Sequence, residues 1–299
     1  LAIGSLIAIQ MTWMRFRNQV NLFLIANVLR AILQATSVVV LLYYGFGVTG
    51  VIFASLLSTT VTFLFCLVVQ FNDLFSTIRI NFVIKILNYG WPMVLSGTAS
   101  FLLLGLEQWW IAAVLGTADM AVYAIALKFA MMTAFLMQPF NLWWLPKRFK
   151  LLKETDGYDA NARIVCYGVT MSFLAAFVVT WVGKIYITLM LPIDYHHAID
   201  YLSWLAIMWA LKNTAELMNI GIYIKEMNLK PMVINWFVGI IAIAGFYYLI
   251  PYIHISGAIF VLYSAYVVRL FLFVFYSQKQ LPLDYRYSRL IFVNSFIAT

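Results

Sequence analysis

Long apolar runs separated by short polar connections fill this sequence from end to end. A bilayer-spanning helix needs about 20 apolar residues. Runs of that length cover 20–44, 48–70, 88–115, 119–144, 164–191, 198–224, 231–251 and 255–277. Shorter runs at 1–14 and 287–299 are partial spans. The pattern predicts an all-α polytopic membrane protein with about eight complete and two partial spans.

Composition supports this class and excludes a soluble domain. Hydrophobic residues make up 65% of the chain and charged residues only 10%, whereas a soluble domain carries about 25% charged residues. Both ends lie inside apolar segments, so we expect the chain to be an excerpt of a longer protein that lacks its first helices and its C-terminal end.

The net charge of +8 reflects membrane topology and does not indicate a nucleic-acid partner. The connections alternate: 45–50, 116–119, 192–200 and 251–256 contain no Lys or Arg, while the intervening connections are basic. The basic connections contain Arg15 and Arg17; Arg79 and Lys85; Lys147, Arg148, Lys150, Lys153 and Arg163; Lys225 and Lys230; and Lys279, Arg286 and Arg289. By the positive-inside rule, these connections are cytoplasmic.

A short internal repeat predicts the domain organisation. Residues 47–53 (GVTGVIF) resemble residues 254–260 (HISGAIF), and each copy opens a span from the outer side. The copies are six spans apart and share one orientation, which predicts two helical bundles related by a pseudo-twofold axis along the membrane normal. The expected domains are the second half of an N-terminal lobe, a cytoplasmic inter-lobe loop, a C-terminal six-helix lobe, and a cytoplasmic loop with the start of an additional helix. Their ranges are 1–70, 71–85, 86–279 and 280–299.

Four basic residues lie inside apolar spans: Arg30, Lys128, Lys212 and Arg269. Each costs roughly 2.5–3.5 kcal/mol near the bilayer centre on insertion scales. Pairing or snorkelling towards the headgroups offsets that cost for any one of them. For all four together we expect a wet cavity that accepts an anionic ligand.

Polar residues at helical spacing accompany these cations on one face of several spans. The stripes are Asn27, Arg30, Gln34 and Ser37; Ser55, Ser58, Thr59 and Thr62; Ser96, Ser100 and Glu107; and Lys212, Glu216, Asn219 and Tyr223. Helices that are polar on one face line a water-filled space. Two alternatives stay open: Ser and Thr can bond their own backbone or a neighbouring helix, and Lys212 and Glu216, one turn apart, can neutralise each other.

Candidate chemistry beyond these stripes is sparse. Glu107 is either a counter-ion or a coupling carboxylate that titrates during transport. The outer connection around His196 and His197 lacks the second ligand pair of a metal site. Metalloprotease, P-loop and nucleophile-elbow motifs are absent from the sequence. We therefore expect no catalytic residue, metal or cofactor, and no enzyme.

Three motifs in order carry a family resemblance. Residues 88–96 (NYGWPMVLS) open a span, residues 105–116 (GLEQWWIAAVLG) close it, and residues 121–129 (AVYAIALKF) open the next. This order resembles the start of the second lobe in polysaccharide and O-antigen flippases of the multidrug/oligosaccharidyl-lipid/polysaccharide exporter superfamily. Glu107 stands where Asp is usual and Ala121 where Gly is usual, which leaves the role of the carboxylate open.

The resemblance implies a transporter of the bacterial cytoplasmic (inner) membrane. Its substrate would be a polyprenyl-diphosphate-linked oligosaccharide, flipped to the outer leaflet for surface polysaccharide synthesis by alternating access. The implied partners are this lipid, the bilayer and the polysaccharide polymerase machinery, without nucleic acid or cofactor.

Charge-assisted hydrogen bonds to a diphosphate would come from the cations. The expected ligands are Arg30, Lys128 and Arg269, with Lys212, Gln34 and Asn27 as further contacts, and the expected coupling carboxylates are Glu107 and Glu216. Two alternatives remain. One is a multidrug/organic-cation antiporter of the same superfamily, and the other is a membrane-embedded transferase of the glycan pathway that uses the His196–His197 loop.

Overall fold

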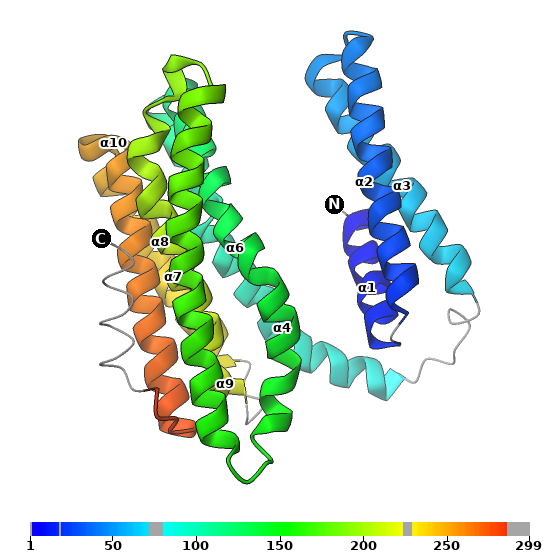
Figure 1. Ribbon diagram of the computed structural model, residues 1–299, viewed down its shortest axis with the longest axis vertical. Coiled ribbons are helices and arrows are strands. Elements are labelled where there is room, and N and C mark those ends of the chain that lie inside the picture. Colours follow the sequence, from blue (N-terminus) through cyan, green and yellow to red (C-terminus); the bar gives the residue numbers. More distant parts are fainter. Residues whose placement is uncertain (1, 18, 72–79, 224–228, 286–299) are drawn as a thin grey trace. The chain divides into compact units, whose positions relative to one another are not determined.

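The chain folds into helices that form two compact units, residues 1–83 and 84–299. The computed structural model describes residues 2–17, 19–71, 80–223 and 229–285 (Figure 1), and no strand occurs among them. The first unit contains α1 (Ala2–Phe16), α2 (Val20–Tyr43), α3 (Gly47–Val69) and the start of α4 (Ile80–Leu103). The second contains the rest of α4, α5 (Leu106–Val114), α6 (Thr117–Leu151), α7 (Gly157–Met190), the 3-10 turn η2 (Ile193–Tyr195), α8 (Ala198–Leu217), α9 (Ile220–Tyr223) and α10 (Leu229–Gln280).

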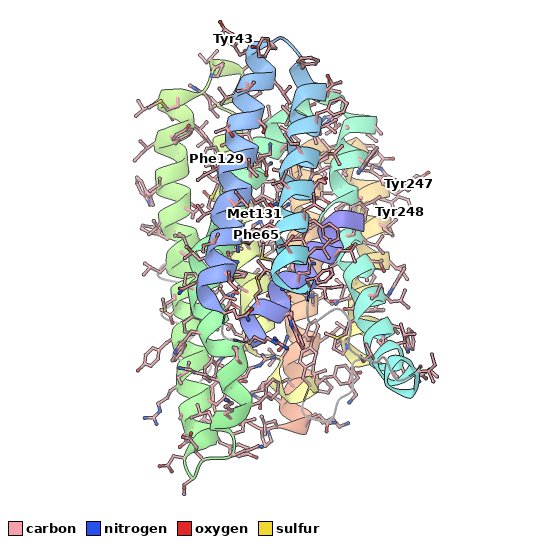
Figure 2. All side chains as sticks on the ribbon, turned by 90° about the vertical axis from the view of Figure 1, so that its right-hand side faces the viewer. Tyr43, Phe65, Phe129, Met131, Tyr247 and Tyr248 are labelled. Carbon is pink, nitrogen blue, oxygen red and sulfur yellow. The ribbon has the colours of Figure 1, made fainter. Side chains whose placement is uncertain are left out.

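The helices have the length and surface of membrane-spanning segments. Within the part of the chain that the structure describes, six stretches are long and apolar enough to cross a bilayer: α2, α3, α4 with α5, α6, α7 and α10. Large apolar side chains cover their outer surfaces, and Tyr247 and Tyr248 project from α10 in this way (Figure 2). Water would disfavour apolar patches of this extent, whereas lipid accommodates them. The predicted all-α, multi-pass fold class is therefore confirmed.

The last and longest helix, α10, is a hairpin of two arms. Ile253 and His254 leave the helical conformation, and His254 has a positive φ of 52°. Beyond this turn the arms pack closely, because a Cβ on Gly245 would meet Val261 and a Cβ on Gly257 would meet the carbonyl oxygen of Leu249. The arms match the two spans predicted at 231–251 and 255–277.

The predicted span 88–115 is broken in the middle. Helix α4 ends at Leu103, and Gly105, with φ +156°, precedes α5. Glycine tolerates this backbone because it lacks a Cβ. The prediction that Ser96, Ser100 and Glu107 share the face of one helix is therefore wrong: Glu107 lies in the first turn of a separate helix.

Several predicted boundaries also differ from the structure: α7 begins at Gly157, before the predicted 164, and α8 ends at Leu217, before the predicted 224. Helix α6 continues to Leu151, past Pro146, although the span was expected to end at 144. Helix α4 begins at Ile80, inside the predicted 71–85 loop. The predicted partial span 287–299, most of the 71–85 loop, the basic residues Arg79, Lys225, Arg286 and Arg289, and most of the predicted 280–299 domain lie outside the described residues. The assignment of the units to lobes stays a prediction.

Helix α8 lies at the centre of the second unit. It packs against α6, α7 and α10 (Figure 1). Its small and branched residues, among them Leu202, Ala206 and Ala210, are fully buried in the main apolar cluster. The polar residues of α8 are consequently held inside the bundle, where they need partners.

Candidate functional site

Three basic side chains from three helices enter the interior of the second unit. Arg148 of α6 is 7% exposed and Arg269 of α10 is 8% exposed, and Lys212 of α8 is partly buried. Glu216 is close enough to interact electrostatically with both Lys212 and Arg148, and Lys212 interacts with Arg269 in the same way. We call these four residues the basic cluster. It contains three cations and one carboxylate, so its surroundings favour an anion.

Arg269 is fixed by a chain of hydrogen bonds across three helical segments. Its Nε donates to Asn235 Oδ1 at 2.8 Å, and Asn235 Nδ2 donates to Ser96 Oγ at 2.7 Å. The guanidinium carbon lies 4.9 Å from the ring centroid of Phe273. One terminal nitrogen, Nη1, is buried and has no hydrogen-bond partner. The side chain is thus oriented and keeps a donor available.

Lys212 is held against an aromatic ring. Its ammonium lies 4.2 Å from the ring centroid of Trp209, which stabilises a cation in a desolvated setting. Lys212 and Glu216 each lack an ion pair within 4.0 Å among the described residues. The alternative in which these two residues form a direct pair is therefore not observed.

Arg148 anchors the opposite end of the cluster. Its Nη1 donates to Asn219 Oδ1 at 3.0 Å and to the carbonyl oxygen of Glu216 at 3.3 Å. Its Nε is buried without a partner. The sequence assigned Arg148 to a cytoplasmic loop and missed it as a site residue. The available signal was its spacing of one helical turn from Trp144, which is also buried.

A cavity of about 900 Å³ opens beside Arg148. It lies at the end of the unit that carries the α6–α7 connection and α9 (Figure 1), the end predicted to be cytoplasmic. Its polar lining comes from Arg148, Lys153, Tyr158, Glu216, Asn219, Tyr223 and Gln280. The cavity therefore borders the basic cluster.

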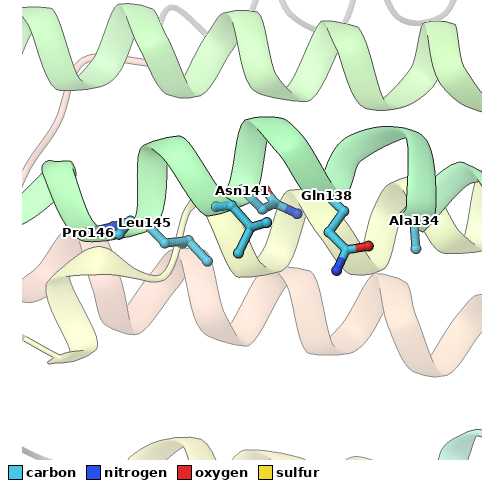
Figure 3. Close-up of a pocket in the computed structure, with 6 residues that line it drawn as sticks. Ala134, Gln138, Asn141, Leu145 and Pro146 are labelled. Carbon is cyan, nitrogen blue, oxygen red and sulfur yellow. The ribbon is translucent and has the colours of Figure 1, made fainter. Parts of the chain in front are cut away.

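A second, smaller cavity of about 210 Å³ follows one face of α6, where Gln138 and Asn141 contribute its polar groups (Figure 3). Asn141 Nδ2 donates to Asn213 Oδ1 at 2.7 Å, and Asn213 Nδ2 donates to Ser172 Oγ at 2.7 Å. This chain joins α6, α8 and α7. None of these three residues was predicted from the sequence as part of a site.

Glu107 is fully buried on α5. Tyr123 donates from its hydroxyl to Oε1 at 3.3 Å, and the backbone N–H of Gly105 donates to Oε2. No described basic side chain forms an ion pair with Glu107, so the counter-ion alternative is not observed. Its role as a coupling carboxylate, like that of Glu216, stays a prediction.

The remaining predicted ligands lie outside the basic cluster. Arg30 and Gln34 are half-buried on α2 and have no hydrogen bond or ion pair to another described residue. Asn27 donates to the carbonyl oxygen of Phe23 in its own helix at 2.8 Å. Lys128 is exposed on α6. Their roles as ligands stay predictions.

Comparison with known proteins identifies the fold. No protein-family model matches the chain, and no curated protein matches it. A solved structure that does match is described as the outward-facing conformation of a multidrug resistance MATE family transporter of the MOP superfamily. It is 18% identical, with a TM-score of 0.58 over 94% of this chain and 65% of that one. The chain thus has a polytopic membrane fold similar to that transporter's, and it spans less than two thirds of its length.

Proposed function

We propose that the chain is part of a membrane transporter that flips a polyprenyl-diphosphate-linked oligosaccharide from the cytoplasmic to the outer leaflet. The observation that carries this proposal is the excess of positive charge in the basic cluster. Arg269 and Arg148 each keep a buried nitrogen without a partner, which costs about 1–3 kcal/mol per group, and more for a charged one. An anionic ligand would remove that cost.

The chemistry of a diphosphate suits these groups. Its oxygens accept charge-assisted hydrogen bonds from guanidinium and ammonium donors, and these bonds are stronger in a low-dielectric interior. Sugar hydroxyls would meet the amides and hydroxyls of Asn219, Tyr223 and Gln280, which line the adjoining cavity. An inside-negative potential also assists outward movement of an anion, by about 2.3 kcal/mol per charge per 100 mV.

Native mass spectrometry of the full-length protein, purified from its own membranes in a mild detergent, tests the proposal. We expect a co-purifying polyprenyl-diphosphate oligosaccharide that is lost in the Arg269→Gln and Lys212→Gln variants. Lys150→Gln is the matched control, because Lys150 is exposed on α6 outside the basic cluster. Retention of the lipid by the double variant Arg269→Gln/Lys212→Gln would overturn the assignment.

The second candidate is an organic-cation antiporter, and the environment of Glu107 favours it. A buried carboxylate with no basic partner, bonded instead to Tyr123, is a group that a cation or proton could neutralise. The matched solved structure is itself described as a multidrug resistance transporter. Proteoliposomes loaded with ethidium separate the candidates: proton-driven ethidium efflux that Glu107→Gln abolishes would replace the flippase proposal.

A further inference from the structure

We infer that the cavity beside Arg148 is a binding site in its own right, which takes a phosphate or diphosphate ester that carries a sugar. Its place at the predicted cytoplasmic end makes it a loading site ahead of the rest of the basic cluster. This role in a transport cycle rests on the proposed function, whereas the binding itself does not.

The first argument is that hydrogen bonds hold the Arg148 side chain in a fixed orientation. Asn219 Oδ1 and the Glu216 carbonyl oxygen both hold its Nη1, so the guanidinium plane is fixed before any ligand arrives. Its Nε is enclosed by protein, so the donors that can serve a ligand are the terminal nitrogens of the guanidinium, and Arg148 lines the cavity. A fixed guanidinium with spare donors matches the geometry of phosphate oxygens.

The second argument is the charge of the lining. Lys153 lines the same cavity just beyond the end of α6, and its ammonium forms no hydrogen bond or ion pair with another described residue. Arg148 and Lys153 outnumber Glu216, the one carboxylate among the lining residues. A fixed guanidinium and an exposed ammonium that line one cavity are complementary to a multiply charged anion.

The third argument is the size and composition of the other walls. About 900 Å³ lies within the range of small-ligand pockets, roughly 300–1,000 Å³, and is far more than a bare phosphate fills. Phe149, Tyr158 and Tyr223 provide aromatic surface, and Gln280 an amide. Aromatic faces with a few polar groups suit a sugar ring attached to the phosphate.

One lining residue of the cavity, Glu216, lies close to the other cations. It lies one helical turn from Lys212, which interacts electrostatically with Arg269. An anion released by Arg148 and Lys153 therefore finds the next positive charges within the same bundle.

Binding of inorganic pyrophosphate to the full-length protein in mild detergent, measured by isothermal titration calorimetry, tests the inference. Lys153→Gln decides the matter, because this exposed side chain forms no hydrogen bond or ion pair with another described residue. We expect it to raise the Kd about tenfold, the effect of one charge-assisted hydrogen bond. Arg148→Lys should also raise the Kd about tenfold, because lysine keeps the charge and lacks the planar set of N–H donors of a guanidinium. Lys150→Gln, which removes the same charge outside the cavity, should change Kd less than twofold.

Equal weakening by Lys153→Gln and Lys150→Gln would show general surface attraction and would overturn the site, as would an unchanged Kd in Lys153→Gln. Two further ligands identify the source of the phosphate. Tighter binding of a detergent-solubilised polyprenyl diphosphate indicates a lipid headgroup, and tighter binding of a nucleoside-diphosphate sugar indicates a soluble donor. Either result supports the site if Lys153→Gln weakens it.

Different results would contradict the flippase proposal and the proposed binding site beside Arg148. Co-purification of the lipid-linked oligosaccharide with a pyrophosphate Kd that is insensitive to Lys153 would leave the flippase proposal and remove the loading site. Lys153-dependent binding without any lipid-linked oligosaccharide would do the reverse.

Discussion

Two helices built on the same pattern differ in charge at one buried position. Helix α3 and the second arm of α10 each begin with one copy of the repeated sequence. The first residue of each copy, Gly47 or His254, has a φ of +52°. The buried positions then correspond at a constant offset. They are Gly50, Ala54, Ser58, Thr62, Cys66 and Gln70 in the first copy, and Gly257, Val261, Ala265, Arg269, Phe273 and Ser277 in the second.

The difference lies at Thr62 and Arg269. Thr62 is satisfied within its own helix, where its hydroxyl donates to the Ser58 carbonyl oxygen at 2.7 Å. Arg269 reaches across to Asn235 on the other arm and keeps a free buried nitrogen. The repeat therefore sets which face is buried, and one residue decides whether that face is neutral packing or a charged site.

The largest effect is expected when a cation is placed in α3, the copy of the repeat that is neutral at this position. Thr62→Arg should destabilise the protein by about 3 kcal/mol, because Thr62 is fully buried and a cation placed there loses its hydration. Thermal unfolding in detergent measures the loss. Thr62→Val is the control and should stay within about 1 kcal/mol, since only a bond within the helix is lost. A melting temperature for Thr62→Arg equal to that of the control would contradict this reading.

The reverse exchange, at Arg269, should weaken ligand binding while the protein still folds. Arg269→Thr is expected to weaken binding of the proposed diphosphate ligand about 100-fold, the usual result of removing one partner of a buried charged contact. Titration of a polyprenyl diphosphate by native mass spectrometry measures it. An unchanged affinity in a folded variant would remove Arg269 from the site.

Substitutions of Asn235, the hydrogen-bond partner of Arg269, separate the effect of charge from the effect of positioning. Asn235→Asp places a carboxylate at the position that accepts from Arg269 Nε, so the cation becomes internally neutralised. We expect ligand affinity to fall about tenfold without loss of thermal stability. Asn235→Ala removes the link without adding charge. If both variants weaken the ligand equally, positioning and not charge is the contribution of Asn235.

The last prediction compares the glycines at the start of each copy. A Cβ on Gly257 would lie 2.6 Å from the Leu249 carbonyl oxygen, whereas one on Gly50 would lie 2.9 Å from Phe46 Cβ. Gly257→Ala should therefore cost about 1–3 kcal/mol, and Gly50→Ala less. Thermal unfolding of the two variants compares them, and a larger loss for Gly50→Ala would reverse the predicted order.

The fold could be predicted from the sequence to the level of spans, because long apolar runs report membrane helices directly. The turn at His254 was also visible, since it opens a repeat. The break at Gly105 was not, because one glycine in an apolar run resembles many that stay helical. Arg148 was missed since its neighbours Lys147 and Lys150 made the segment resemble a loop.

Partners across helices were the least predictable part of the site. Arg269 was recognised as an unusual charge, but nothing near it in sequence indicates that Asn235 lies opposite. The chain from Asn141 through Asn213 to Ser172 joins residues far apart in sequence. Periodicity reports which face of a helix is buried, and it carries no information on which helix that face meets.

Helix α6 carries residues of two separate polar sites, one near each end. Near one end Tyr123 holds Glu107, and at the other Arg148 borders the cavity. Pro139 and Pro146 lie between Tyr123 and the C-terminal end of the helix, and proline weakens a helix where it removes a backbone hydrogen bond. Each proline leaves one backbone carbonyl of α6 without its bond in the helix, so bending of α6 costs least between Tyr123 and Arg148.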